Sequence, residues 1–163
     1  MTTVMEKFFS PKSVCVIGAS GTPGKPGNVV IRNMHDAGFK GKIYLVNPRG
    51  GEIEGHKVYP SIDELPDNID QAGVTLPASG TPDTVRALGK KNVEAIILAA
   101  SGFAEVDQMG EALQQDLIAA IRESGARVIG PNTTGHISVP GNYTSSFFPL
   151  GELRRGSVSY ITQ

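Results

Sequence analysis

The sequence has very few of the residues that define disulfide-rich or metal-rich proteins. Cys15 is the only cysteine among 163 residues, and tryptophan is absent. A single cysteine excludes an intrachain disulfide and a thiolate metal cluster. Because Cys15 lies in an apolar run, we expect it to be a buried core thiol. His35, His56 and His136 are far apart in the chain and have no metal-binding spacing, so we expect them to be structural or solvated.

Long apolar runs and an excess of one charge are also missing. No run is long enough to cross a bilayer, and residues 1–7 lack the pattern of a signal peptide, so we expect a cytoplasmic protein without membrane contact. The net charge is −1 and the 15 lysines and arginines are scattered, which argues against a nucleic-acid partner. With 39% hydrophobic residues, the chain can form one full domain, or one domain and a fragment of a second.

The clearest feature that is present is a glycine-rich loop after a short apolar run. Residues 14–17 are apolar, and Gly18, Gly21, Gly24 and Gly27 follow at three-residue spacing. This pattern predicts a buried strand, a loop and the start of a helix, where backbone N–H groups can approach an anion. The spacing is G-x-x-G-x-x-G rather than G-x-G-x-x-G, so it favours a phosphate-bearing ligand without naming it. A flexible Gly/Pro connection is the alternative.

The rest of the chain alternates between strand and helix patterns. The capping-box pattern of Ser61 and Glu64 predicts a single helical turn. We expect residues 55–59 to form a connector or a short edge strand, and residues 8–11 to form a packed N-terminal plug. The succession predicts an α/β fold, a Rossmann-like doubly wound parallel sheet in three layers α/β/α with right-handed crossovers. We expect strands at 14–17, 42–47, 72–77, 95–100 and 127–130, and helices at 26–37, 81–91 and 106–124.

The end of the second strand distinguishes between nucleotide ligands. In a dinucleotide-binding fold, an acidic residue there pairs with free ribose hydroxyls, whereas a cation accommodates a ribose phosphate. The predicted strand tip carries Asn47 and Arg49, and no acidic residue follows it before Glu52. This arrangement disfavours NAD and favours an adenosine whose 2′- or 3′-phosphate faces Arg49. The alternative is that Arg49 is a solvated loop charge.

The last part of the chain has a different composition. Residues 138–151 lack periodicity and are rich in Pro, Gly, Ser and Thr, which is typical of a linker, and residues 156–163 predict the start of a strand. We therefore divide the chain into a binding domain, residues 1–138, and a linker with the first strand of a truncated second domain, residues 139–163. Since one strand cannot bury itself, the chain is either a piece of a longer protein or its last strand joins the edge of the first sheet.

Several of these motifs together resemble a known family. The ordered set is similar to the CoA-binding domain of NDP-forming acyl-CoA synthetases, which are relatives of the succinyl-CoA synthetase α subunit. The resemblance covers nearly the whole chain and implies that coenzyme A lies across the carboxyl ends of the parallel strands. The motifs that carry it are residues 8–14 (FFSPKSV), the loop from Gly18 to Gly27, Val46-Asn47-Pro48, Ser101-Gly102-Phe103-Ala104-Glu105 and Gly130-Pro131-Asn132-Thr133.

The resemblance also implies which residues bind CoA. The glycine loop would line the nucleotide phosphates, Arg49 would face the ribose phosphate, and Asn132 would border the thiol end. Residues after the third and fourth strands would flank the adenosine and pantetheine. The full set is Gly18, Ser20, Gly21, Thr22, Pro23, Gly24, Lys25, Asn47, Pro48, Arg49, Pro77, Ala78, Ala100, Ser101, Gly102 and Asn132. It contains no catalytic residue and no metal ligand.

The resemblance further implies chemistry that this chain lacks. In the family, acid, nucleotide and CoA are joined through an acyl phosphate and a phosphohistidine of a second domain, and none of the three histidines here matches that residue. We therefore expect the CoA-binding part of an acid–thiol ligase, unable by itself to complete acyl-CoA synthesis. The expected partners are the remaining synthetase domains or a partner subunit, and a homodimer through the face left exposed is a further expectation.

Two alternatives are kept beside this reading. An NADP-binding relative of atypical short-chain dehydrogenases would share the loop and Arg49, although no tyrosine here has the lysine four residues later that such enzymes commonly use. A stand-alone domain that senses CoA or a nucleotide would be complete as it stands. Hydride transfer with NADPH would support the first alternative, and the length of the natural chain separates the second from the ligase.

Overall fold

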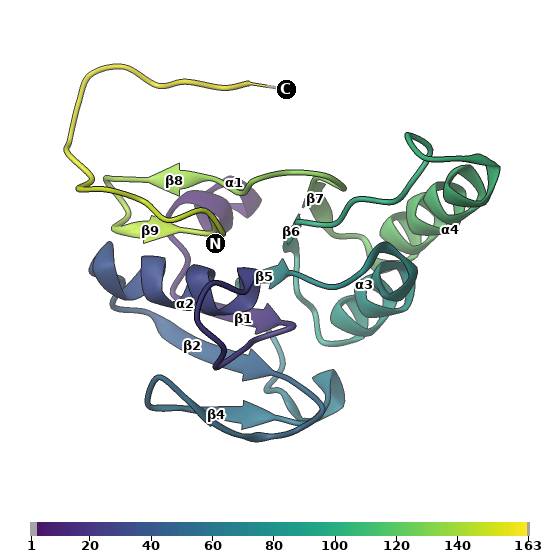
Figure 1. Ribbon diagram of the computed structural model, residues 1–163, viewed down its shortest axis with the longest axis horizontal. Helices are drawn as coiled ribbons and strands as arrows, with labels where there is room; N and C mark the ends of the chain where they lie inside the picture. Colours follow the sequence, from purple (N-terminus) through teal and green to yellow (C-terminus); the bar gives the residue numbers. More distant parts are fainter. Residues whose placement is uncertain (1–2, 163) are drawn as a thin grey trace.

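A seven-stranded, mostly parallel sheet forms the centre of the protein (Figure 1). The computed structural model describes residues 3–162, so Met1, Thr2 and Gln163 lie outside the described residues. The strand order is β3-β4-β2-β1-β5-β6-β7, and within it only β3 runs antiparallel to its neighbour. The strands are β1 (Ser13–Ile17), β2 (Lys42–Val46), β3 (Gly51–Ile53), β4 (His56–Tyr59), β5 (Gln71–Val74), β6 (Ala95–Leu98) and β7 (Arg127–Ile129).

Helices cover both faces of this sheet, which confirms the predicted three-layer α/β/α fold (Figure 1). One face packs against α1 (Val4–Phe9), α2 (Pro26–Asp36) and the hairpin of β8 (Ile137–Ser138) and β9 (Tyr143–Thr144). The other face packs against the short turns η1 (Ile62–Glu64) and η2 (Ala78–Gly80) and the helices α3 (Thr81–Lys90) and α4 (Gln108–Ser124). Among residues 3–162, no helix has the length and apolar character needed to cross a membrane.

The alternation of side chains along β1 produces the two cores. Val14 and Val16 pack on the α2 face, whereas Cys15 and Ile17 pack on the face of α3 and α4. All four are buried, as expected for a central parallel strand covered on both sides. Burial raises the pKa of the Cys15 thiol to about 12, so this cysteine is the core thiol that its apolar surroundings predict.

Some helix starts and caps differ from those that the sequence pattern predicts. Helix α4 begins at Gln108 rather than 106, because the Asp107 carboxylate accepts a hydrogen bond from the Gly110 N–H at 2.8 Å and ends the preceding loop. The turn at η1 forms, but Ser61 makes no side-chain capping bond, so the predicted capping box is wrong. In the predicted N-terminal plug, Phe8 is buried but Phe9 is 43% exposed.

The segment predicted as a linker packs against the sheet instead. Tyr143 is 1% exposed and joins the core beneath α2, and the next three residues are also buried. The Tyr143 hydroxyl donates to Gln71 Oε1, while Gln71 Nε2 donates to the carbonyls of Lys7, at 2.9 Å, and Phe8, at 3.1 Å. Ordered packing therefore continues to about residue 148, and the structure describes no strand between residues 151 and 162.

This buried hydrogen-bond chain is predicted to stabilise the fold measurably. Replacing Tyr143→Phe removes the hydroxyl but leaves the buried Gln71 Oε1 without its donor, which costs about 1–3 kcal/mol of unfolding free energy. Urea denaturation measures the change. Tyr44→Phe is the matched control, because the Tyr44 hydroxyl makes no hydrogen bond to any described residue. Equal stabilities of the two variants would contradict the prediction.

Stability is also predicted to depend on the protonation of His136. Its Nε2 lies 2.6 Å from the Phe8 carbonyl oxygen and its Nδ1 lies 2.8 Å from Ser145 Oγ, which suits a neutral ring. Burial lowers the pKa of His136 below its ordinary 6.5, so the unfolded chain takes up a proton that the folded chain resists. The stability that neutral His136 contributes to the fold is therefore fully present above about pH 6.5 and is lost as the pH falls below that value. Urea unfolding at about pH 7.5 and about pH 5.5 gives the unfolding free energy at each pH. Between the two, this free energy should fall less for His136→Gln than for the parent, and an equal fall would refute the role of His136.

Candidate functional site

The glycine loop leaves β1 at the carboxyl edge of the sheet, next to β5. The chain passes from β1 outward to β2 and β4, then returns to β5 on the other side of β1, so the loop lies at the switch point where ligands of this fold class bind. Gly18 has φ +89°, and a Cβ there would lie 2.8 Å from the Thr75 carbonyl oxygen. The Thr75 hydroxyl lies 3.2 Å from the Ile17 carbonyl oxygen and 3.3 Å from that of Gly18, to which it can donate. Thr75, which the sequence analysis missed, forms the floor of the loop.

The other end of the loop packs as closely. A Cβ on Gly27, in the first turn of α2, would lie 2.1 Å from the Gly18 carbonyl oxygen, so only glycine allows this contact between helix and strand end. In contrast, a Cβ on Gly21 would have as its nearest neighbour an Ile53 carbon at 3.7 Å, and one on Gly24 would meet nothing within 4 Å. The two outer glycines are needed for packing, whereas a Cβ on either inner glycine would make no close contact.

Several backbone N–H groups of the loop donate to no acceptor among residues 3–162. The Thr22 N–H donates to Ser20 Oγ at 3.1 Å and the Lys25 N–H to the Thr22 carbonyl at 3.3 Å. Among the described residues, none accepts from the backbone N–H groups of Ser20, Gly21, Gly24 and Gly27. These N–H groups precede or open α2, where the helix dipole also favours an anion.

A buried side chain next to the loop is likewise unsatisfied. Asn28, in the first turn of α2, is 2% exposed, and its Oδ1 has no hydrogen-bond partner among the described residues. An unpaired buried amide oxygen costs free energy, so such groups gather at sites where a ligand or water supplies the donor. Sequence alone offers no sign of this, because an asparagine near a helix start is common.

The tip of β2 is fastened to the loop by one side chain. Asn47 Nδ2 donates to the Ala19 carbonyl at 2.9 Å, and Asn47 Oδ1 accepts from the Arg49 N–H at 2.9 Å. Both ends of this amide are used, so Asn47 positions the loop and the turn. Arg49 and Pro48 are exposed, and the Arg49 guanidinium forms no ion pair with any described residue.

The ends of β5 and β6 lie beside one another. A Cβ on Gly102, which has φ +111°, would lie 3.5 Å from the Ala78 Cβ. The Glu105 carboxylate accepts from the N–H groups of Gly102, at 2.8 Å, and Phe103, at 3.1 Å, which lowers the pKa of Glu105. Glu105 therefore holds the turn that carries Ser101 and Gly102, with Ala100 buried beneath it.

The end of β7 completes the edge. Asn132 pairs as an isolated bridge with Ala99, and the Ala100 N–H donates to the Pro131 carbonyl at 3.0 Å. The strands that carry Arg49 and Asn132 are four positions apart in the order β2-β1-β5-β6-β7, which separates them by roughly 19 Å. All the predicted residues thus share one edge of the sheet, arranged for an elongated ligand rather than a compact one.

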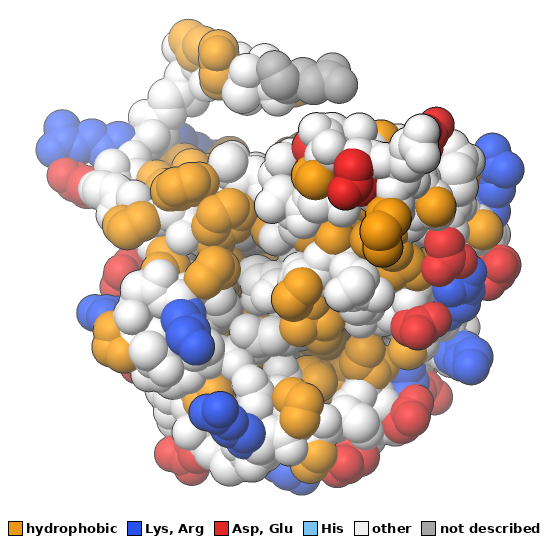
Figure 2. Space-filling view, turned by 45° about the vertical axis from the view of Figure 1, so that its right-hand side comes forward, with side chains coloured by type: hydrophobic (Ala, Val, Ile, Leu, Met, Phe, Trp, Pro, Cys, Tyr) orange, Lys and Arg blue, Asp and Glu red, His pale blue; other side chains and the backbone are white. Residues whose placement is uncertain are grey.

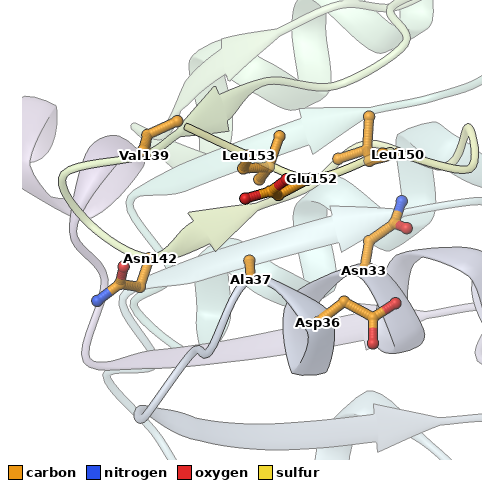
Figure 3. A pocket seen from close by; sticks show the side chains of 9 residues that line it. Asn33, Asp36, Ala37, Val139, Asn142, Leu150, Glu152 and Leu153 are labelled. Carbon is orange, nitrogen blue, oxygen red and sulfur yellow. The ribbon is translucent and has the colours of Figure 1, made fainter. Parts of the chain in front are cut away.

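The face toward which the strands' carboxyl ends point is open and carries little charge at its centre. Figure 2, which turns this side toward the reader, shows mostly hydrophobic and uncharged side chains across the middle, with most of the acidic and basic side chains nearer the margins. A hollow of about 390 Å³ lies elsewhere, between the C-terminal end of α2 and the segment of residues 139–153 (Figure 3). It shares no residue with the predicted set, and its lining residues are Asn33, Asp36, Ala37, Val139, Asn142, Leu150, Gly151, Glu152 and Leu153.

Comparison with known proteins shows the family of this chain. Residues 12–138 match the family described as "CoA binding domain". The chain belongs to this CoA-binding family. It is 39% identical over 163 residues to the α subunit of acetate–CoA ligase [ADP-forming] I from Pyrococcus furiosus, and 36% identical over 159 residues to acetate–CoA ligase [ADP-forming] II from Archaeoglobus fulgidus. These matches confirm the resemblance to NDP-forming acyl-CoA synthetases and favour CoA over NADP.

A solved structure agrees with these sequence matches. The dinucleotide forming acetyl-coenzyme A synthetase 1 of Ca. Korarchaeum cryptofilum, in complex with phosphate and ADP, superposes with a TM-score of 0.83 at 35% identity, over 89% of this chain and 31% of that one. The aligned region is 98% of this chain but only 35% of the Pyrococcus furiosus relative and 24% of the Archaeoglobus fulgidus relative. The CoA-binding domain therefore spans about a third or less of these relatives.

The two kinds of loop glycine are predicted to respond differently to alanine. Gly27→Ala forces a methyl group against the Gly18 carbonyl, so we expect a loss of about 1–3 kcal/mol in unfolding free energy. Gly21→Ala is the matched control and should unfold within about 0.5 kcal/mol of the parent, because its Cβ meets no atom closer than 3.7 Å. Denaturant titrations of the two variants test this, and equal stabilities would contradict the close contact.

Proposed function

We propose that the protein is the CoA-binding part of an ADP-forming acid–thiol ligase. The observation that carries the proposal is the loop from Gly18 to Gly27 in a chain of the CoA-binding family. At the start of α2, this loop presents backbone N–H groups that no described residue accepts. In this proposal the loop binds the phosphates of CoA and the remaining ligand extends across the carboxyl edge of the sheet. The reaction is an inference from relatives that are named acetate–CoA ligases.

The proposed binding mode gives each strand end a part. Arg49, exposed and without an ion pair among the described residues, faces the ribose phosphate. Pro77, Ala78 and Ala100–Gly102 line the adenosine and pantetheine, and Asn132 borders the thiol. Asn28, with its unpaired Oδ1, is added to this set as an acceptor for a ligand or water donor near the loop. Asn47 supports the loop through one bond from Nδ2 and one to Oδ1, and it stays in the binding set with its second Nδ2 hydrogen.

The proposal assigns the chemical steps to partners. The predicted binding set contains no catalytic residue, and the chain corresponds to about a third of the length of the α subunit it resembles. We therefore propose that the remaining synthetase domains, on a continuing chain or on a partner subunit, activate the acid and deliver the acyl group to CoA. CoA held at the sheet edge leaves its thiol end near Asn132 for that transfer. In isolation, the open edge is also a candidate homodimer surface.

Titration with CoA and dephospho-CoA tests the role of Arg49. Loss of a charge-assisted contact to the 3′-phosphate costs about 1.5–3 kcal/mol, so the parent should bind dephospho-CoA roughly ten- to a hundredfold more weakly than CoA. Arg49→Gln should bind CoA and dephospho-CoA with about the same affinity, equal to the affinity of the parent for dephospho-CoA. Isothermal titration calorimetry on the chain gives these constants directly.

Two further variants make this test specific. Arg127→Gln removes an exposed arginine at the opposite end of the sheet and should leave the preference for CoA unchanged. Gly21→Ala, for which we expect little change in stability, should weaken the binding of both ligands to the same degree, because its methyl group blocks the approach of the backbone to the phosphates. Absence of CoA binding by the parent would overturn the proposed function, whereas binding without a preference for the 3′-phosphate would overturn only the Arg49 assignment.

A further inference from the structure

The fold brings together two histidines that are 21 residues apart in the chain. His35 lies on the last turn of α2 and His56 opens β4, next to the edge of the sheet. Their Nε2 atoms are 3.0 Å apart and the ring centroids 5.2 Å, so the two imidazoles meet through their Nε2 atoms. His35 is exposed and His56 is partly exposed, so an ion in solution can reach the pair.

The spacing of the two nitrogens matches one metal geometry better than another. At imidazole–metal bond lengths of about 2.0–2.1 Å, two neighbouring ligands of a square-planar or octahedral ion lie about 2.9 Å apart, whereas tetrahedral ligands lie about 3.3 Å apart. The observed 3.0 Å is the present N–H···N distance and is close to the first value, so a turn of the exposed His35 ring can give the two nitrogens the separation that one such ion requires. Imidazole is a preferred ligand of Ni²⁺ and Cu²⁺, which adopt square-planar or tetragonal coordination.

We propose that His35 and His56 form a two-histidine site for a divalent transition-metal ion with square-planar or octahedral preference, such as Ni²⁺ or Cu²⁺. No group of three or more His, Cys, Asp or Glu side chains converges among the described residues, so water completes the coordination. One imidazole now donates its Nε2 hydrogen to the other. Binding moves that proton to Nδ1, because both Nε2 lone pairs must face the ion, and the exposed His35 ring can turn to allow it.

The metal would join two elements that the chain connects only through β2 and β3. Helix α2 carries the glycine loop at its start, and β3 places Ile53 beside Gly21. An ion shared by α2 and β4 therefore holds the β3–β4 hairpin against the helix. The site is independent of the proposed function, since none of its atoms belongs to the predicted CoA-binding set.

Calorimetric titration of the tag-free chain with Ni²⁺ tests the proposal. We expect one bound ion per chain and a rise in thermal midpoint. His35→Gln and His56→Gln should each weaken binding by roughly a hundredfold, because the second imidazole of a fixed pair binds at high effective concentration. Arg32→Gln, an exposed change on the same helix, is the control and should bind Ni²⁺ as the parent does.

Spectra of the unsubstituted protein provide a second measurement that needs no variant. Paramagnetic Ni²⁺ should broaden the ring NMR signals of His35 and His56 at lower concentrations than those of the buried His136. The proposal is overturned if the parent binds no Ni²⁺, if either histidine variant binds as tightly as the parent, or if His136 broadens first. Tighter binding of Zn²⁺ than of Ni²⁺ would overturn the assigned coordination geometry.

Discussion

The contact between Gly27 and the carbonyl of Gly18 is the constraint on which the binding edge depends. It presses the first turn of α2 onto the end of β1, since a single methyl group at Gly27 would lie 2.1 Å from that oxygen. The loop between the two glycines must then project beyond the sheet, and several of its N–H groups have no acceptor in the part of the chain that the structure describes. Asn47 and Thr75 fasten the loop from the strands on either side. The packing of helix on strand thus positions the loop that we propose as the phosphate-binding site.

A second constraint joins the two ends of the described chain. Gln71, fully buried in the central sheet, donates to α1 through the Lys7 and Phe8 carbonyls and accepts from Tyr143 of β9. His136 adds a contact from β8 to the Phe8 carbonyl. Because these groups are buried, each depends on the others for its hydrogen bonds, so α1 and the β8–β9 hairpin form part of the domain rather than its extensions.

Comparison of pattern with structure shows where sequence reasoning succeeded. The apolar runs at β1, β2 and β6 and the periodic stripe of α4 were recognised within a few residues, because burial on a sheet imposes a regular spacing of side chains. Within residues 138–151, predicted as a linker, Tyr143 and the next three residues are buried, and the sequence did not indicate this because a short hairpin that packs through one tyrosine leaves no periodic signal. The Ser61 capping box was wrong because its hydroxyl makes no capping bond.

The sequence by itself determined the fold class, the place of the glycine loop and the cation at Arg49, because these follow from local spacing and composition. Its ordered motifs also carried the resemblance to the CoA-binding family, which the comparisons confirm. Only the tertiary structure decided which donors of the loop lack an acceptor among the described residues, and that the buried Asn28 Oδ1 lacks a donor there. It also showed that Asn47 holds the loop to the tip of β2. It alone also brought His35 to His56, from α2 and β4. Contacts of this kind depend on how helices pack across strands, and the separation of two residues in the sequence does not reveal them.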